Sequence, residues 1–183
     1  MSNQKTFFLI AAIDDLNDFV GKTTAWLCFG MVLVTFAVVI LRYTFNIGWV
    51  WLQESVSYMH ALVFLLGIGY TLKHNGHVRV DIFYSSMGLK SKAIVDLLGC
   101  LFLLFPVIGF IAWVSWDFVA SSWSILEGSP EAGGIPAVFI LKTAIIAMAV
   151  LTFLQGFALA LRSVFTLAGH HQPIADDEPF PEV

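Results

Sequence analysis

The chain has 183 residues, of which 58% are hydrophobic and only 12% are charged. A soluble domain normally carries about 25% charged residues, so this composition argues against a soluble protein. The formal net charge of -4 comes largely from acidic residues near the C-terminus. We expect the proline-containing segment 170–183 to be a disordered acidic tail.

Four stretches contain no charged residue: 23–41, 55–72, 97–116 and 143–161. A helix needs about 20 residues to cross about 30 Å of hydrocarbon. A soluble all-α core explains four such stretches in one short chain poorly. We therefore predict an all-α integral membrane protein with one domain over residues 1–183. Its transmembrane helices are expected at about 23–42, 53–72, 94–123 and 137–161.

The N-terminal residues 5–20 place Ile13, Leu16 and Val20 at helical spacing, with acidic residues between them. This pattern predicts an amphipathic helix that lies along the inner membrane surface or rests on a partner protein. The apolar run 7–13 ends at Asp14, and no small-residue cleavage site follows. We therefore do not expect a signal peptide.

The second predicted span carries small and weakly polar residues on one face. Ser57, His60, Phe64, Gly67 and Thr71 recur at steps of three and four residues. Such a stripe is typical of helix packing rather than of lipid contact. After this span, Asn-Gly at 75–76 predicts a turn, and the alternating residues that follow predict a short interfacial helix before the third span.

The third and fourth spans contain further packing signals. Pro106 removes one backbone hydrogen bond, so we expect a kink there. Gln155 lies deep in the fourth span and is expected to hydrogen-bond to another helix, while Gly156 and Ala160 have small-xxx-small spacing. Cys28 and Cys100 lie in apolar spans and are interpreted as packing residues, with a redox pair as a remote alternative.

Lysine and arginine near the span ends predict the orientation of the chain. Arg42 and Lys142 are at one side, and the other side holds Lys5, Lys22, Lys73, Arg79, Lys90, Lys92 and Arg162. The second group is expected to be cytoplasmic, which places both termini inside. Tryptophans favour the headgroup region. The expected anchors at the outer interface are Trp49, Trp51, Trp113, Trp116 and Trp123.

The spans contain too few polar residues for a catalytic site, so we expect no enzyme activity, no cofactor and no metal. An intramembrane histidine such as His60 still suggests a function. Two facing histidines from separate helices hold a haem, and His60 has no such partner in another span. A haem-binding or plain membrane anchor of a respiratory oxidoreductase therefore remains the alternative function, and an orphan structural membrane protein is a third. A self-sufficient transporter usually shows repeats, broken helices and a midplane site, and four spans with one proline and few buried polar residues are inadequate for this.

Several segments resemble the small membrane (permease) subunit of TRAP transporters, the DctQ-like family. They are Arg42-Tyr43-Thr44-Phe45-Asn46, Trp51 with Gln53-Glu54, and His77-Val78-Arg79-Val80-Asp81. The pattern E-x-x-x-E-A-G-x-x-P from Glu127 to Pro136, then Lys142 and Gln155, is also similar to that family. The resemblance covers about residues 15–162.

The resemblance implies a bacterial uptake system driven by a sodium gradient, that is, a symporter. A periplasmic solute-binding protein would deliver the solute, often an organic acid. A large multi-span subunit would hold the substrate and sodium sites. The present chain would pack on the scaffold of that subunit in the inner (cytoplasmic) membrane, in contact with membrane lipid. We expect no nucleic-acid partner.

The expected partner-interface residues are Arg42, Glu54, Ser57, His60, Gly67, His77, Arg79, Asp81, Gln155 and Gly156. For Glu54, a solvated carboxylate favoured by the helix dipole is the alternative. Lipid headgroups are the alternative partner of the charged inner loop. Arg42 is expected to reach the headgroups or to pair with Glu54. Glu127 and Glu131 are candidates for contact with the binding protein, or they lie in a plain solvated loop.

Overall fold

The computed structural model describes residues 2–77 and 84–169. The helices are α1 (Ser2–Phe45), α2 (Val50–Lys73), α4 (Leu89–Gly99), the π-helical turn η1 (Cys100–Leu104), α5 (Phe105–Ser124) and α6 (Val138–Leu167). Since α4, η1 and α5 run on without a break, four helical segments are long and apolar enough to cross a membrane. This confirms the predicted all-α fold with four spans. Most of the predicted interfacial helix and the acidic tail fall outside the described residues.

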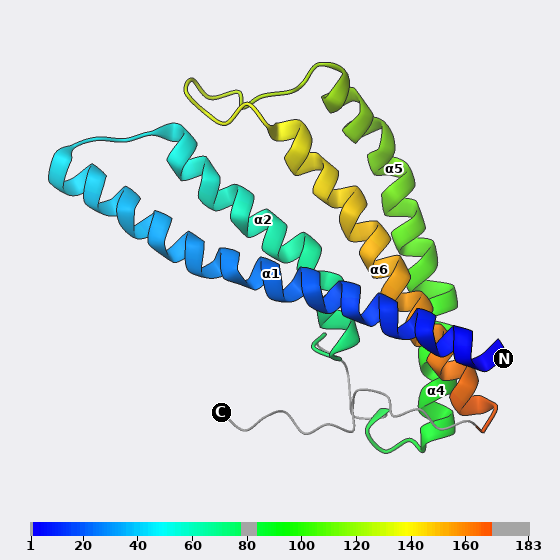
Figure 1. Ribbon diagram of the computed structural model, residues 1–183. Helices are drawn as coiled ribbons and strands as arrows, with labels where there is room; N and C mark the ends of the chain where they lie inside the picture. Colours follow the sequence, from blue (N-terminus) through cyan, green and yellow to red (C-terminus); the bar gives the residue numbers. More distant parts are fainter. Residues whose placement is uncertain (1, 78–83, 170–183) are drawn as a thin grey trace.

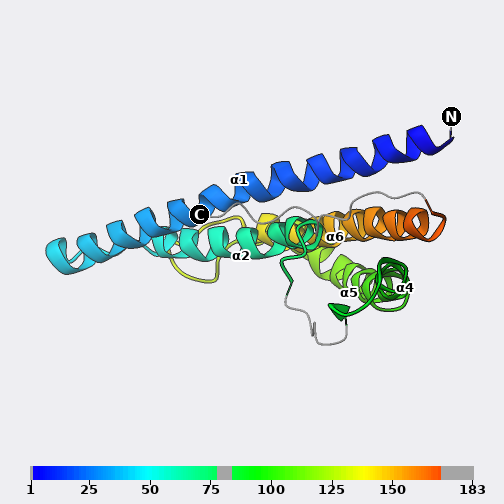
Figure 2. The same cartoon turned by 90° about the horizontal axis from the view of Figure 1, so that it is seen from below.

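Helix α1 joins the predicted amphipathic segment and the first span into one helix of 44 residues. At 1.5 Å per residue it is about 66 Å long, roughly twice the thickness of the hydrocarbon layer. Figures 1 and 2 show α1 as a single rod that crosses the other helices at an angle. The location of residues 5–20 along the inner membrane surface remains a prediction.

Two ends of the bundle can be distinguished by their connections. The α1–α2 and α5–α6 connections lie together at one end, called here the Glu54 end (Figure 1). At the other end, called the Arg162 end, lie the C-terminal parts of α2 and α6 and the N-terminal half of α1.

Helix α6 lies at the centre of the described structure, where it contacts α1, α2, α4, η1 and α5. One core cluster joins Ile10 and Ile13 of α1 to Ala158 of α6. A second cluster joins Ile108 of α5 to Met148 and Ala149 of α6. Small residues recur along the buried face of α6, which lets neighbouring helices approach closely.

The irregularity predicted around Pro106 takes the form of the π-helical turn directly before it. The N–H of Phe105 donates to the carbonyl of Cys100, five residues back. Proline has no N–H, and its ring crowds the carbonyl four residues earlier. The wider π turn relieves this crowding and is one of the recognised causes of helix bending. Cys100 is buried at this turn, whereas Cys28 is exposed on α1.

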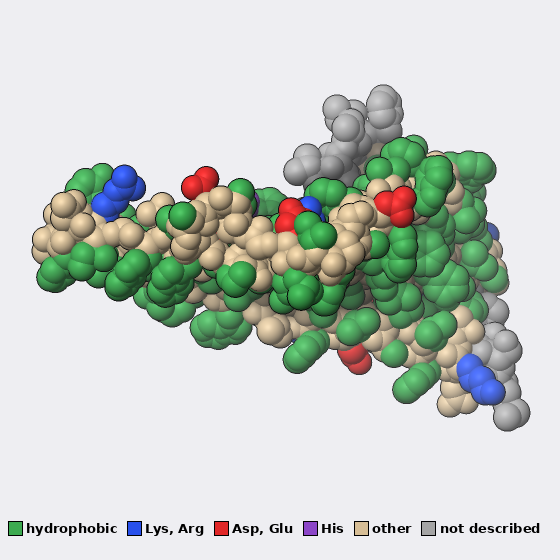
Figure 3. All heavy atoms as spheres, turned by 90° about the horizontal axis from the view of Figure 1, so that it is seen from above, with side chains coloured by type: hydrophobic (Ala, Val, Ile, Leu, Met, Phe, Trp, Pro, Cys, Tyr) green, Lys and Arg blue, Asp and Glu red, His purple; other side chains and the backbone are tan. Residues whose placement is uncertain are grey.

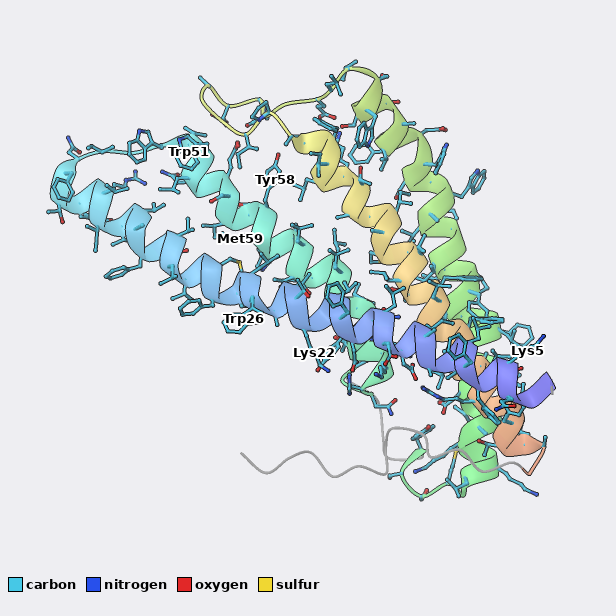
Figure 4. All side chains as sticks on the ribbon, viewed as in Figure 1. Lys5, Lys22, Trp26, Trp51, Tyr58 and Met59 are labelled. Carbon is cyan, nitrogen blue, oxygen red and sulfur yellow. The ribbon has the colours of Figure 1, made fainter. Side chains whose placement is uncertain are left out.

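Glycine allows α1 and α2 to pack closely toward the Arg162 end. A Cβ on Gly21 would lie 2.4 Å from Cγ of Tyr70, and a Cβ on Gly69 would lie 2.1 Å from Oδ1 of Asn17. Further along the pair, Met59 points from α2 toward α1, while Trp26 points away from α2 (Figure 4). These contacts fix the depth at which α1 lies against α2.

We expect Gly21→Ala to lower the thermal unfolding temperature. The added methyl group would overlap the base of the Tyr70 ring, and overpacking of this kind costs about 1–3 kcal/mol. Gly109→Ala is the matched control, because its Cβ would meet nothing within 4 Å and alanine gains up to about 1 kcal/mol over glycine in a helix. Unfolding of both variants in one detergent tests this, and equal midpoints would contradict it.

Candidate functional site

The stripe predicted on α2 has no helix of this chain packed on it within the described residues. Ser57 and His60 are exposed, and Phe64 is 65% exposed. A Cβ on Gly67 would meet nothing within 4 Å. Thr71 donates its hydroxyl to the carbonyl of Gly67 in its own helix. The helix packing that the sequence predicts on this face is therefore not made by the described helices of this chain.

The position of His60 makes this face unusual. It lies ten residues after the start of α2, about 15 Å along the helix axis and thus near the middle of a hydrocarbon layer of about 30 Å. Its ring packs against that of Phe64, with centroids 4.6 Å apart. An exposed imidazole at this depth is costly when it faces lipid, so it normally faces protein or water.

The exposed faces of α1 and α5 differ from the stripe on α2, because large apolar side chains cover them. On α1 they include Trp26, Phe29, Val32, Leu33, Phe36 and Val39; on α5, Val107, Phe110, Trp113, Val114, Trp116 and Phe118. Figure 3 shows hydrophobic side chains over much of one side of the molecule, with few charged groups among them. Faces covered mainly by large apolar side chains are suited to lipid.

Glu54 holds the connection between α5 and α6 at the Glu54 end. Its carboxylate accepts a hydrogen bond from the Ser129 hydroxyl, and a second, at 2.6 Å, from the backbone N–H of Ile135. Arg42 lies exposed and forms no ion pair within the described part of the chain. The pairing of Arg42 with Glu54, one of two alternatives from the sequence, is therefore not formed.

The glycines of this connection leave space for the Glu54 carboxylate and allow the backbone turn around it. A Cβ on Gly134 would lie 2.4 Å from Oγ of Ser129 and 2.7 Å from Oε2 of Glu54. Gly133 has a φ of +79°, a left-handed conformation that side chains disfavour. The Ser129 N–H also donates to the carbonyl of Ile135 at 3.1 Å. The S-P-E-A-G-G-I segment is therefore built around a side chain that is distant in the sequence.

A second carboxylate, Glu127, fixes the start of the same connection to α6. Lys142 donates to Glu127, and its ammonium group also lies 3.9 Å from the centroid of the Phe118 ring. The hydrogen bond from Lys142 holds the pKa of Glu127 below its ordinary value of 4.5. Glu131 is exposed and forms no ion pair within the described residues.

We expect the Glu127–Lys142 pair to make stability depend on acid. Because the folded pKa lies below the unfolded value, the pair contributes fully above about pH 4.5 and is lost as pH falls through the lower folded pKa. Unfolding temperatures measured from about pH 6 to about pH 3 should fall further for the natural chain than for Glu127→Gln. Equal losses in the two proteins would contradict this expectation.

A buried polar network joins α1 to α6 at the Arg162 end. Gln155 accepts from Nδ2 of Asn17 at 2.9 Å and donates to Asp14 at 3.0 Å, which confirms the predicted bond from Gln155 to another helix. Arg162 forms an ion pair with Asp14. Asn17 and Gln155 are almost completely buried, and Asp14 is 8% exposed.

Asp18 extends this network to the end of α2. Lys73 lies 2.8 Å from its carboxylate, His74 lies 2.9 Å away and Lys22 lies 3.1 Å away. The acidic residues of 5–20 were predicted to lie on a helix along the inner membrane surface or on a partner protein, so these contacts were not foreseen. One available signal is the spacing of Asp14, Asn17 and Asp18 by three and four residues, which puts all three on one helix face.

The remaining candidates are distributed over the two ends. Gly156 lies inside the chain, where a Cβ would meet Leu104. His77 is exposed beyond the end of α2, and Arg79 and Asp81 lie outside the described residues.

The predicted tryptophan anchors lie near the start of α2 and along α5. Trp49 and Trp51 stack at the start of α2 with centroids 6.0 Å apart, and Trp123 donates to Thr143. Trp113 and Trp116 are exposed on α5.

Comparison with known proteins assigns the chain to a protein family. Residues 31–166 match the model for "Tripartite ATP-independent periplasmic transporters, DctQ component". The chain is 33% identical over 92 residues to the C4-dicarboxylate TRAP transporter small permease protein DctQ of Vibrio cholerae, an alignment of 48% of this chain and 38% of the relative. It thus spans less than half the length of that relative. No solved structure matches the chain. With a family match over most of its length and four helices able to cross a membrane, the chain belongs to the DctQ family of TRAP transporter components.

Proposed function

We propose that this chain is the small membrane subunit of a sodium-coupled TRAP symporter, and that it packs on the scaffold of the large transport subunit. The observation that carries the proposal is the stripe on α2, where Ser57 and His60 are exposed and a Cβ on Gly67 would meet nothing within 4 Å. It is small and weakly polar, and it lies at membrane depth, where the faces of α1 and α5 are apolar. A helix of the large subunit would cover it and supply a hydrogen-bond partner to His60.

The rest of the proposal concerns orientation and solute. Lys22, Lys73 and Arg162 gather at the Arg162 end, which supports a cytoplasmic location of that end and of both termini in a bacterial inner membrane. His77, Arg79 and Asp81 would then face the cytoplasm, where they contact the large subunit. The solute is an organic acid delivered by a periplasmic binding protein, and a relative named for C4-dicarboxylates supports this class. Gln155 and Gly156 contact helices of their own chain, and we leave them out of the interface.

Co-purification from native membranes tests the interface. We expect the double variant Ser57→Phe with Gly67→Phe to reduce recovery of a large multi-span partner about tenfold, which corresponds to about 1.4 kcal/mol. The variant should keep its own unfolding temperature, because neither residue is packed inside the chain. Leu33→Phe on the exposed face of α1 is the control. Unchanged recovery of the partner would reject this face as the interface.

The same eluate tests the alternative function. A membrane anchor of a respiratory oxidoreductase would purify with flavin or iron–sulfur subunits, and with a Soret band if it binds haem. A colourless complex with one large multi-span protein is the expected result. A Soret band would overturn the proposal and make His60 a candidate haem ligand.

A further inference from the structure

The connection between α5 and α6 has a tip that is exposed although its base is fixed. Residues 130–133 are exposed, and residues 127–129 and 134–135 on either side are half-buried. The base is closed by a hydrogen bond that the backbone N–H of Ser129 donates to the carbonyl of Ile135. Figure 1 shows this loop reaching across from α6 toward the start of α2. A surface loop positioned by a rigid scaffold is a common setting for recognition.

We infer that Glu54 is the positioning residue of a docking loop, and that the tip at residues 130–133 binds the periplasmic solute-binding protein. This inference rests on the proposed function, which gives the system such a protein and places the Glu54 end outside. Glu54 acts through the loop and makes no contact with the docked protein. Glu131 at the tip makes that contact, with a basic group of the binding protein.

The geometry at Glu54 explains why a carboxylate is required there. Its two oxygens accept bonds from Ser129 and Ile135, which lie on opposite sides of the tip. One side chain therefore closes the loop from both ends. Glutamine has the same shape but only one oxygen, so its amide nitrogen would face one of the two donors. Glu54→Gln thus loosens the loop with the smallest change in volume.

The charge of the tip indicates what kind of surface it fits. Glu127 is neutralised by Lys142, and Glu54 is satisfied by the loop itself. Within the described part of the connection, Glu131 is the acidic side chain left exposed without an ion pair. A loop that is already ordered loses less conformational freedom on binding than a mobile one. A basic patch on the binding protein is the complementary partner.

The test uses the complex with the large subunit, reconstituted in lipid nanodiscs and titrated with the binding protein. We expect Glu54→Gln and Glu131→Gln each to weaken docking about tenfold. The double variant should be little weaker than either single variant, because Glu131 loses its effect once the loop is loose. Ser129→Ala removes one of the two bonds and should weaken docking less. Gln53→Ala, at the exposed neighbouring position, is the control.

Two further readouts separate failure of this inference from failure of the proposed function. Limited proteolysis should cut residues 130–133 faster in Glu54→Gln than in the natural chain. Faster cutting with unchanged docking, or no change in either, overturns the inference and leaves the proposed function standing. Loss of the large subunit from the Glu54→Gln complex also overturns it, because Glu54 would then contact that subunit directly. A natural complex that contains no large subunit overturns the proposed function itself.

Discussion

Replacing Arg162 with leucine is expected to destabilise the folded chain by about 3–5 kcal/mol, the cost typical of removing one partner from a buried ion pair. The Arg162 and Asp14 side chains are each 12% exposed. Without Arg162, the carboxylate of Asp14 would keep one hydrogen bond, from Gln155, and would lose its only ion pair within the described residues. The fraction of monodisperse protein and the unfolding temperature in detergent would both fall.

Two variants serve as controls for this prediction. Adding Asp14→Asn to Arg162→Leu should recover most of the loss, because asparagine removes the charge and keeps an oxygen that can accept from Gln155. Lys22→Ala breaks the pair with Asp18, but Lys22 is 67% exposed, so its loss should cost no more than about 1 kcal/mol. A double variant as unstable as Arg162→Leu alone would show that the charge of Asp14 is not the cause.

Gln155→Leu should be the second most damaging change, at about 1–2 kcal/mol. It leaves the side-chain N–H of Asn17 without its partner in α6 and removes one donor from Asp14. A buried polar group that loses its partner costs about 1–3 kcal/mol, and interhelical bonds in membranes fall in the lower part of that range. Chemical or thermal unfolding of the purified subunit measures the difference.

Thr152→Val is the matched control on the same helix. Thr152 is 2% exposed, and its hydroxyl has no hydrogen-bond partner within the described structure. Valine has nearly the same shape and lacks the hydroxyl, so this change should be neutral or slightly stabilising. If Thr152→Val cost as much as Gln155→Leu, burial on α6 and not the bond to Asn17 would explain both results.

The spans could be predicted from the sequence because hydrophobic length is a local property. The described helices extend beyond the predicted spans, as in Val50–Lys73 against 53–72. The bond from Gln155 to another helix was also predictable, because a buried amide needs a partner. Its partners were not, since Asp14 and Asn17 lie more than a hundred positions away in a segment whose acidic residues fit a surface helix equally well.

At the other end of the molecule, the partners of Glu54 were likewise not predictable from the sequence. The sequence gives a carboxylate near a helix start, where the helix dipole, a nearby arginine or a partner protein all offer an explanation. The structure shows instead that Glu54 closes a loop of its own chain through a hydroxyl and a backbone N–H. The E-A-G-G-I segment and Glu54 were both recognisable as family features, but only the fold shows that they belong to one arrangement.

The central place of α6 has a consequence for how the protein is made. This helix contacts every other described helix, yet it is the last of the described helices to be synthesised. Until residues 155–162 enter the membrane, Asp14 and Asn17 lack the partners that they have in the finished fold. A chain stopped before α6 would therefore present Asp14 and Asn17 without their α6 partners, and α1 would lack the polar contacts that hold it in the finished fold.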